Sequence, residues 1–114
     1  MSQSHKRAGR QLEDLAPVFE ALGDRTRLSL VSRLCADGPL SIARLSDGQA
    51  CTRQAVTKHL QFLAGAGVAR SRRQGRESIW ELVPAPLEGA CASLTEISSQ
   101  WDAAIGRLRA FVEE

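Results

Sequence analysis

The segment Ser41-Ile-Ala-Arg-Leu-Ser-Asp-Gly-Gln-Ala-Cys-Thr-Arg-Gln-Ala-Val-Thr-Lys-His-Leu60 predicts two helices separated by a tight turn. Ser41 is placed to cap a short first helix, and Thr52 is placed to cap the second. Asp47-Gly48 lies between them and is typical of a turn. The segment therefore predicts a compact helix pair rather than one continuous helix.

The second helix of this pair has an apolar and a polar side. Val56, Leu60 and Leu63 recur at spacings of 4 and 3, so we expect them to face inward. The other sides are polar, and Gly65 or Gly67 is expected to end the helix in a left-handed conformation. A short helix, a tight turn and a capped helix with an exposed polar face indicate a helix-turn-helix arrangement.

Two further helices are predicted before this pair. The first covers residues 11–22 and is interrupted or restarted near Pro17. The second is capped by Asp24 and ends at Gly38-Pro39. The inward residues expected in these two helices are Leu12, Leu15, Phe19 and Leu22, and then Leu28, Val31, Leu34 and Cys35.

A β-hairpin and a long last helix are predicted after the pair. Residues 68–70 and 78–83 flank a polar turn at 72–76, with Ile79 and Leu82 expected inward. Pro84 and Pro86 are expected to close the strand, and the last helix then runs from about 87 to 112. Its apolar residues have heptad-like spacing, and its length of roughly 39 Å exceeds what one small domain covers, which predicts a partner. These residues are Leu87, Cys91, Leu94, Trp101, Ile105, Leu108 and Val112, with Ile97 and Phe111 beside them.

The charge is distributed unevenly along the chain. The net charge is only +2, but residues 48–76 contain six Lys and Arg and no Asp or Glu. Residues 77–114 contain two Arg and seven acidic residues. A basic block that coincides with the second helix of the pair and with the hairpin is the footprint expected of a polyanion-binding face.

Over about residues 18–83, the sequence resembles the ArsR/SmtB-type winged helix-turn-helix repressors. Four motifs carry the resemblance: Phe19-Glu-Ala-Leu-Gly-Asp-Arg-Thr-Arg27, Leu40-Ser-Ile-Ala-Arg-Leu45, Thr52-Arg-Gln-Ala-Val-Thr-Lys-His-Leu60 and Gly65-Ala-Gly-Val-Ala-Arg-Ser-Arg-Arg-Gln-Gly-Arg76. Trp101-Asp and Leu108-Arg-Ala-Phe are similar to a metal-independent branch of that family. The resemblance implies a mainly α fold with a small β-hairpin, and a homodimer that forms through the first and last helices and represses transcription.

The expected partner is double-stranded operator DNA. Short or flexible polar side chains at a helix N-terminus suit the major groove, and a cationic hairpin suits the minor groove or the phosphates. The expected DNA-binding residues are Thr52, Arg53, Gln54, Ala55, Thr57, Lys58, His59, Arg72, Arg73 and Arg76. The expected dimerisation residues are Leu12, Leu15, Phe19, Leu94, Trp101, Ile105 and Leu108. For His59, a phosphate contact and simple packing are equally compatible with the sequence.

The sequence favours neither a metal nor a cofactor. Many relatives hold metal on a Cys-x-Cys pair in the third helix or on carboxylate and His ligands in the last, but residues 40–45 contain no ligand and the last helix contains no His. A thiol-responsive repressor that uses Cys35 and Cys91 is an alternative. We expect both cysteines on apolar faces, where a Cys usually acts as a small hydrophobe. The inducing signal stays open.

Length and composition exclude other classes. The 114 residues, 43% of them hydrophobic, suit one domain, which we place at 11–114 after a flexible basic tail at 1–10. Three cysteines, no signal peptide and no long apolar run predict a cytoplasmic protein with no membrane contact. No catalytic constellation stands out, so we expect no enzyme. A winged-helix module for protein contact is a further alternative, but it would not need an acid-free basic block.

Overall fold

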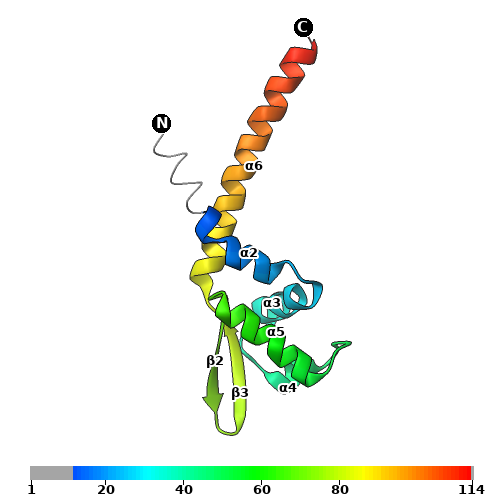
Figure 1. Cartoon of the computed structure of the whole chain (residues 1–114), viewed down its shortest axis with the longest axis vertical. Helices are drawn as coiled ribbons and strands as arrows, with labels where there is room; N and C mark the ends of the chain where they lie inside the picture. Colours follow the sequence, from blue (N-terminus) through cyan, green and yellow to red (C-terminus); the bar gives the residue numbers. More distant parts are fainter. Residues whose placement is uncertain (1–11, 114) are drawn as a thin grey trace.

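A computed structural model describes residues 12–113. The elements follow one another as α2 (Ala16–Leu22), α3 (Arg25–Asp37), β1 (Leu40–Ser41), α4 (Ile42–Ser46), α5 (Arg53–Gly65), β2 (Ala69–Gln74), β3 (Glu77–Leu82) and α6 (Pro84–Glu113). Figure 1 shows α2 to α5 gathered at one side, the β2–β3 hairpin at one end and α6 extending toward the other. The expected tail at 1–10 lies outside the described residues. No helix among residues 12–113 is long and apolar enough to cross a membrane.

The first predicted helix is divided, as the position of Pro17 indicated. Residues 12–14 are helical, Leu15 lies in a turn, and α2 then starts with Pro17 in its first turn. Proline suits this place because the first turn of a helix leaves its N–H groups without intrahelical acceptors. Residue 11 lies outside the described part of the chain.

Helix α3 begins and ends where the sequence predicts, but its buried side differs. The Asp24 carboxylate accepts a hydrogen bond from Arg27 N at 3.0 Å, and Gly38 ends the helix with φ of 76°. The buried residues are Leu30 and Leu34, whereas Leu28 is 53% exposed and Cys35 is exposed. The expected face of Leu28 and Cys35 is therefore wrong. Leu30 and Leu34 lie one helical turn apart and define the side that packs on the core.

The helix pair α4–α5 matches its prediction closely. Ser41 Oγ accepts a hydrogen bond from Arg44 N at 3.3 Å, and Thr52 Oγ1 accepts one from Ala55 N at 3.1 Å. Of the two glycines at the end of α5, Gly65 is the last helical residue and Gly67, which follows the helix, takes the positive φ, 79°. Strand β1 is not predicted, because a strand of two residues is too short to show alternation.

The sheet is antiparallel with strand order β1-β3-β2. The β2–β3 hairpin is longer than predicted: Arg73 pairs with Ser78 and Gln74 with Glu77, which leaves Gly75-Arg76 as a two-residue turn. Ile79 is buried, but the side chain that enters the core cluster is Trp80. Leu82 is half-buried and packs against the same cluster, so both residues expected inward are at least partly buried. They lie on opposite faces of the strand, because successive strand residues alternate and these two are three apart.

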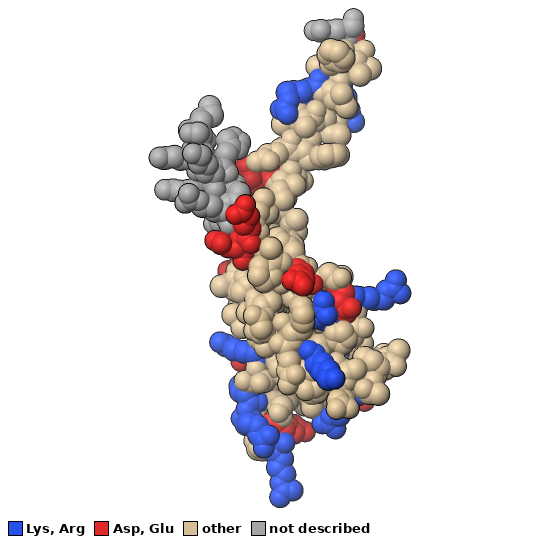
Figure 2. Space-filling view, in the orientation of Figure 1, with Lys and Arg blue, Asp and Glu red and all other residues tan. Residues whose placement is uncertain are grey.

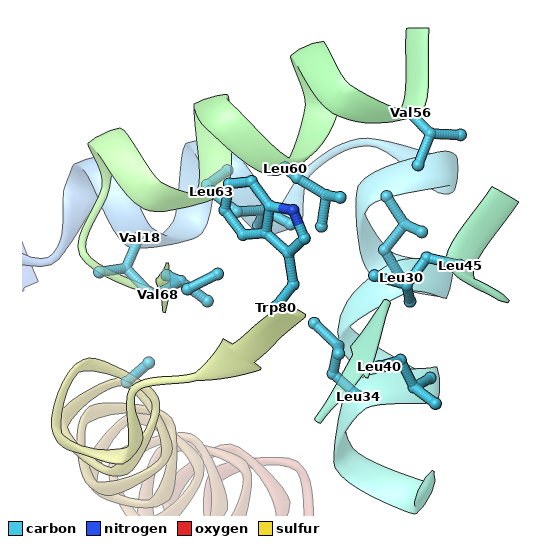
Figure 3. Close-up of a cluster of buried hydrophobic side chains, with 13 residues drawn as sticks. Val18, Leu30, Leu34, Leu40, Leu45, Val56, Leu60, Leu63, Val68 and Trp80 are labelled. Carbon is cyan, nitrogen blue, oxygen red and sulfur yellow. The ribbon is translucent and has the colours of Figure 1, made fainter. Parts of the chain in front are cut away.

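The core is aliphatic around a single tryptophan. Leu30, Leu45, Leu60 and Leu63 are fully buried, and Figure 3 shows Trp80 projecting from β3 toward Leu60 and Leu63 of α5. Trp80 Nε1 is buried and has no hydrogen-bond partner among the described residues. The core therefore fixes α5 against α3 and the sheet.

Helix α6 starts earlier than predicted and leaves most of its apolar side uncovered. It begins at Pro84 rather than near 87, since proline is favoured in the first turn of a helix. Its 30 residues span about 45 Å. Trp101 is 67% exposed, Leu108 60% and Phe111 78%. Among residues 12–113, its first turns pack on the rest of the chain through contacts with α2, and Leu15 packs closely against Gly89.

Candidate nucleic-acid interface

The N-terminal half of α5 is exposed and polar. Arg53, Gln54 and Lys58 are exposed, and Ala55 and Thr57 are half-buried. The inward side of the same helix is formed by Val56 and Leu60, both fully buried. The Thr57 hydroxyl donates to Arg53 O at 3.0 Å, so its proton is used within the helix and its oxygen is left as an acceptor. The helix thus presents one face that suits hydrogen bonding outside the molecule.

The hairpin, which we call the wing (residues 69–82), carries a cluster of arginines. Arg72, Arg73 and Arg76 are exposed, and Figure 2 shows Lys and Arg side chains gathered over the hairpin end of the molecule. Gly75 has φ of 64° in the two-residue turn, a backbone conformation that favours glycine. The turn therefore places the cations at the tip of the wing.

Glu81 on strand β3 neutralises part of the positive charge of the wing. Glu81 Oε1 accepts a hydrogen bond from Arg70 Nε at 3.0 Å and lies 3.8 Å from Arg72 Nε. In the sequence Glu81 falls outside the acid-free block, but strand pairing places it opposite Arg70. Among the described residues, Arg73 and Arg76 form no ion pair, so the wing has two unpaired and two shared cations.

His59 lies apart from the other residues that were expected to bind DNA. Its side chain is 27% exposed, and its Nδ1 lies 3.8 Å from Asp24 Oδ2 and 3.5 Å from Arg27 Nη1. These contacts place His59 at the start of α3, which agrees with the packing alternative. A DNA contact by His59 stays a prediction.

Two arginines that the sequence analysis missed hold the helices in place. Arg27 Nε donates to Ala21 O at 2.7 Å and Nη2 donates to Glu20 O at 3.3 Å, which satisfies carbonyls at the end of α2. Arg33 Nη1 lies within 3.2 Å of the carbonyl oxygens of Arg44, Leu45 and Asp47, at the end of α4. Arg33 thus fixes the turn between α4 and α5. No local pattern reveals either role, because the hydrogen bonds of both arginines join separate helices.

Electrostatics at the start of α3 favour the ionised carboxylate of Asp24. The hydrogen bond from the Arg27 backbone N–H lowers the pKa of Asp24 below its usual value of 3.8, and the Arg27 and His59 charges act in the same direction. The carboxylate therefore stays ionised at neutral pH and caps α3 as an anion near its positive end.

One of the two cysteines of the thiol alternative is placed differently from expectation. Cys35 is exposed rather than on the buried side of α3, whereas Cys91 is exposed on α6 together with the apolar Leu94, and Cys51 is half-buried. Cys35 lines a hollow between α3 and α6, whereas Cys91 lines a different one along α6. Among residues 12–113, no group of three or more His, Cys, Asp or Glu side chains is placed to hold a metal ion.

The expected dimerisation residues fall into two groups. Leu15 and Phe19 are half-buried against the core of the same chain. Leu94, Trp101 and Leu108 are exposed on α6, while Ile105 and Leu12 are half-buried. The exposed group forms an apolar surface for which the described chain provides no cover.

Comparison with known proteins agrees with this geometry. An ArsR-like transcriptional regulator from Rhodococcus sp. RHA1 has a similar structure, with a TM-score of 0.70 and 30% identity over 88% of this chain and 93% of that one. The chain belongs to the ArsR family of transcriptional regulators. The resemblance seen in the sequence is thus confirmed, and the protein is a DNA-binding transcriptional regulator of the winged helix-turn-helix type.

Curated relatives of this ArsR-family regulator carry related descriptions. It is 35% identical, over 52% of its length and 71% of the relative's, to the uncharacterized HTH-type transcriptional regulator YuzN of Bacillus subtilis (strain 168). It is 28% identical, over 62% of its length and 80% of the relative's, to a regulator of the same description from Methanocaldococcus jannaschii. No family model matches the chain. These relatives are transcriptional regulators, a class that is not enzymatic.

Proposed function

We propose that this regulator is a cytoplasmic homodimer without catalytic activity that binds double-stranded operator DNA and represses transcription. The observation that carries the proposal is the exposure of the basic block on two neighbouring elements. Lys58 and Arg53 lie on α5, Arg73 and Arg76 lie on the wing, and α5 contacts β2. A duplex is the partner that this charge suits, since phosphates run along both sides of its grooves.

In this proposal α5 is the recognition helix in the major groove. Gln54 is suited to an adenine edge, and Arg53 or Lys58 to a guanine or a phosphate. The Ala55 methyl group is suited to a thymine methyl. Among the described residues, Thr52 Oγ1 accepts a hydrogen bond from Ala55 N alone, so the N–H groups of residues 53 and 54 at the helix N-terminus are left for a phosphate.

The wing lies along the minor groove or the phosphate backbone. Arg73 and Arg76 are expected to contribute more than Arg72, because Arg72 shares the carboxylate of Glu81. With four to five cations in use per subunit, a dimer neutralises roughly eight to ten phosphates. Half-sites are expected about 34 Å apart, one helical turn of DNA.

In this proposal the dimer forms through α6 together with residues 12–14 and α2. The apolar side of α6 is exposed at Leu94, Trp101 and Leu108, and an exposed patch of this kind marks an interaction surface. A second copy of α6 has the same heptad-like spacing and so covers it by self-complementary packing. Metal sensing is not part of the proposal, because residues 40–45 contain no Cys and α6 contains no His.

The test is a DNA-binding assay on a duplex recovered by selection from random sequences. The Lys58→Ala/Arg76→Ala variant removes four cations from a dimer, and its affinity at about 0.1 M salt is expected to fall about 10²–10³-fold. The Arg107→Ala/Arg109→Ala variant makes the same charge change on α6 and is the control. Equal affinities for both variants and the unmodified protein contradict the proposal. If the protein binds DNA independently of salt, or does not bind DNA at all, the alternative of a winged-helix module for protein contact is favoured instead.

A further inference from the structure

A hollow between α3, β3 and α6 has the dimensions of a small-molecule site. Its volume is about 410 Å³, which lies in the range of 300–1,000 Å³ that is typical of ligand pockets. Its lining includes Gly38 and Pro39, where the chain leaves α3, and Leu82 and Pro84, where β3 is followed by α6. We call it the α3–α6 hollow. It is separate from the exposed cations of α5 and of the wing tip.

The lining of the α3–α6 hollow is apolar with acidic groups and no basic ones. Leu34, Leu82 and Leu87 provide much of the apolar wall, together with Pro39 and Pro84. The charged residues of the lining are Glu81 and Glu88. Among the described residues no Lys, Arg or His forms an ion pair with Glu88, so its carboxylate is left for a partner from outside.

The first turn of α6 adds little attraction for anions to the α3–α6 hollow. A helix N-terminus ordinarily attracts anions through the N–H groups of its first turn. Pro84 and Pro86 occupy two of these positions and have no N–H. The charges that face an occupant are therefore mainly carboxylates.

From the volume, the apolar wall and the two carboxylates, we propose that the α3–α6 hollow binds a small organic cation with an apolar body. The apolar part packs against Leu34, Leu82 and Leu87, and the cationic group pairs with Glu88 and Glu81. Glu81 also accepts from Arg70 Nε at 3.0 Å and lies 3.8 Å from Arg72 Nε, so a ligand cation competes with two wing arginines for this carboxylate. The site therefore adjoins the DNA-binding surface without being part of it, and its binding can be measured without DNA.

The experiment compares three probes of one shape and different charge: 2-naphthylmethylammonium, 2-naphthylmethanol and 2-naphthylacetate. Each is titrated into the full chain at its solution oligomeric state, and binding is followed by the methyl NMR shifts of Leu34, Leu82 and Leu87. We expect the ammonium probe to bind about tenfold more tightly than the acetate, with shifts concentrated at these methyl groups. The proposal is overturned if the acetate binds as tightly as the ammonium probe, if the shifts lie at other residues, or if no probe binds. The last result is also the one expected if a second copy of the chain fills the hollow.

Two single-residue variants test whether Glu88 is the source of the preference for a cationic probe. Glu88→Gln is expected to weaken the ammonium probe about threefold and to leave the alcohol unchanged, as for a partly exposed ion pair. The control is Glu96→Gln, which removes one carboxylate from the same helix outside the hollow. An equal loss in both variants, or an equal loss for the alcohol, contradicts the assignment to Glu88.

Discussion

The guanidinium carbon of Arg27 lies 4.2 Å from the centroid of the Phe62 ring, a contact that joins the start of α3 to α5. The same side chain donates to carbonyl oxygens at the end of α2. One arginine therefore links three helices, and a cation placed over an aromatic face is stabilising. The position of α5 depends on this link although Arg27 is not among the residues proposed to touch DNA.

Removing the Arg27 side chain is therefore expected to reduce both stability and DNA affinity. Arg27→Ala should lower the free energy of unfolding by about 1–2 kcal/mol, since it removes hydrogen bonds and the contact with Phe62. Arg25→Ala, at a neighbouring exposed arginine, is the charge-matched control and should change stability little. A double-mutant cycle with Phe62→Leu is expected to give a coupling of about 0.5–1 kcal/mol. Additive effects would show that the two side chains do not interact.

The pH dependence of stability is expected to report Asp24. Because its pKa is lowered in the folded chain, its contribution is present above its unfolded value of 3.8 and is lost as the pH falls through the folded pKa. Asp24→Asn keeps a capping oxygen but has no carboxylate to titrate, so the acidic part of its Tm-against-pH profile should be flatter. Asp37→Asn, at the other end of α3, is the control. Parallel profiles for the unmodified protein and Asp24→Asn would refute this role.

Two glycines allow a matched test of the wing turn. Gly75 has φ of 64°, so Gly75→Ala should cost about 1–2 kcal/mol and weaken DNA binding by displacing the arginines at the tip. Gly65 is the last residue of α5 and has open space at its Cβ position, so Gly65→Ala should be neutral or slightly stabilising. Thermal unfolding and DNA titration measure both. If Gly75→Ala and Gly65→Ala are equally stable, a side chain at position 75 does not strain the turn and this prediction is wrong.

Charges placed on the exposed apolar side of α6 are expected to separate the subunits. Trp101 and Leu108 are each at least 60% exposed in one chain, so Trp101→Glu/Leu108→Glu should leave the fold intact while opposing a dimer by burying charge. Sedimentation velocity should then show a monomer, whereas Ser99→Glu on the same helix should sediment as a dimer. An undisturbed dimer in the Trp101→Glu/Leu108→Glu variant would place the interface elsewhere.

Local signals explain which parts of the fold were predictable. The caps Asp24, Ser41 and Thr52 were all predicted, because each acts on an N–H only three residues away. The inward face of α5 was also predicted, since its apolar residues repeat over several turns. The two-residue strand β1 was not, because it is too short to show a pattern. The start of α6 at Pro84 was not either, because proline is found both at the ends of strands and in the first turns of helices.

Contacts between distant parts of the chain explain the rest. Arg27 and Arg33 resemble ordinary surface arginines in the sequence, yet each donates to carbonyl oxygens of another helix. Glu81 lies outside the basic block in the sequence and opposite Arg70 in the sheet. The face of α3 was misassigned at Leu28 because an apolar residue on a helix can also lie exposed. The exposed polar residues of α5 and the wing are where the sequence placed them, and their DNA contacts stay predictions.

The central claim is that cations on α5 and on the wing bind the phosphates of one duplex. The most direct test is the salt dependence of DNA affinity for the unmodified protein. A plot of log K against log salt concentration is expected to have a slope on the order of −7 to −9, which corresponds to eight to ten neutralised phosphates in a dimer. A slope near zero would contradict the claim, because a surface that binds phosphates cannot avoid releasing their counterions.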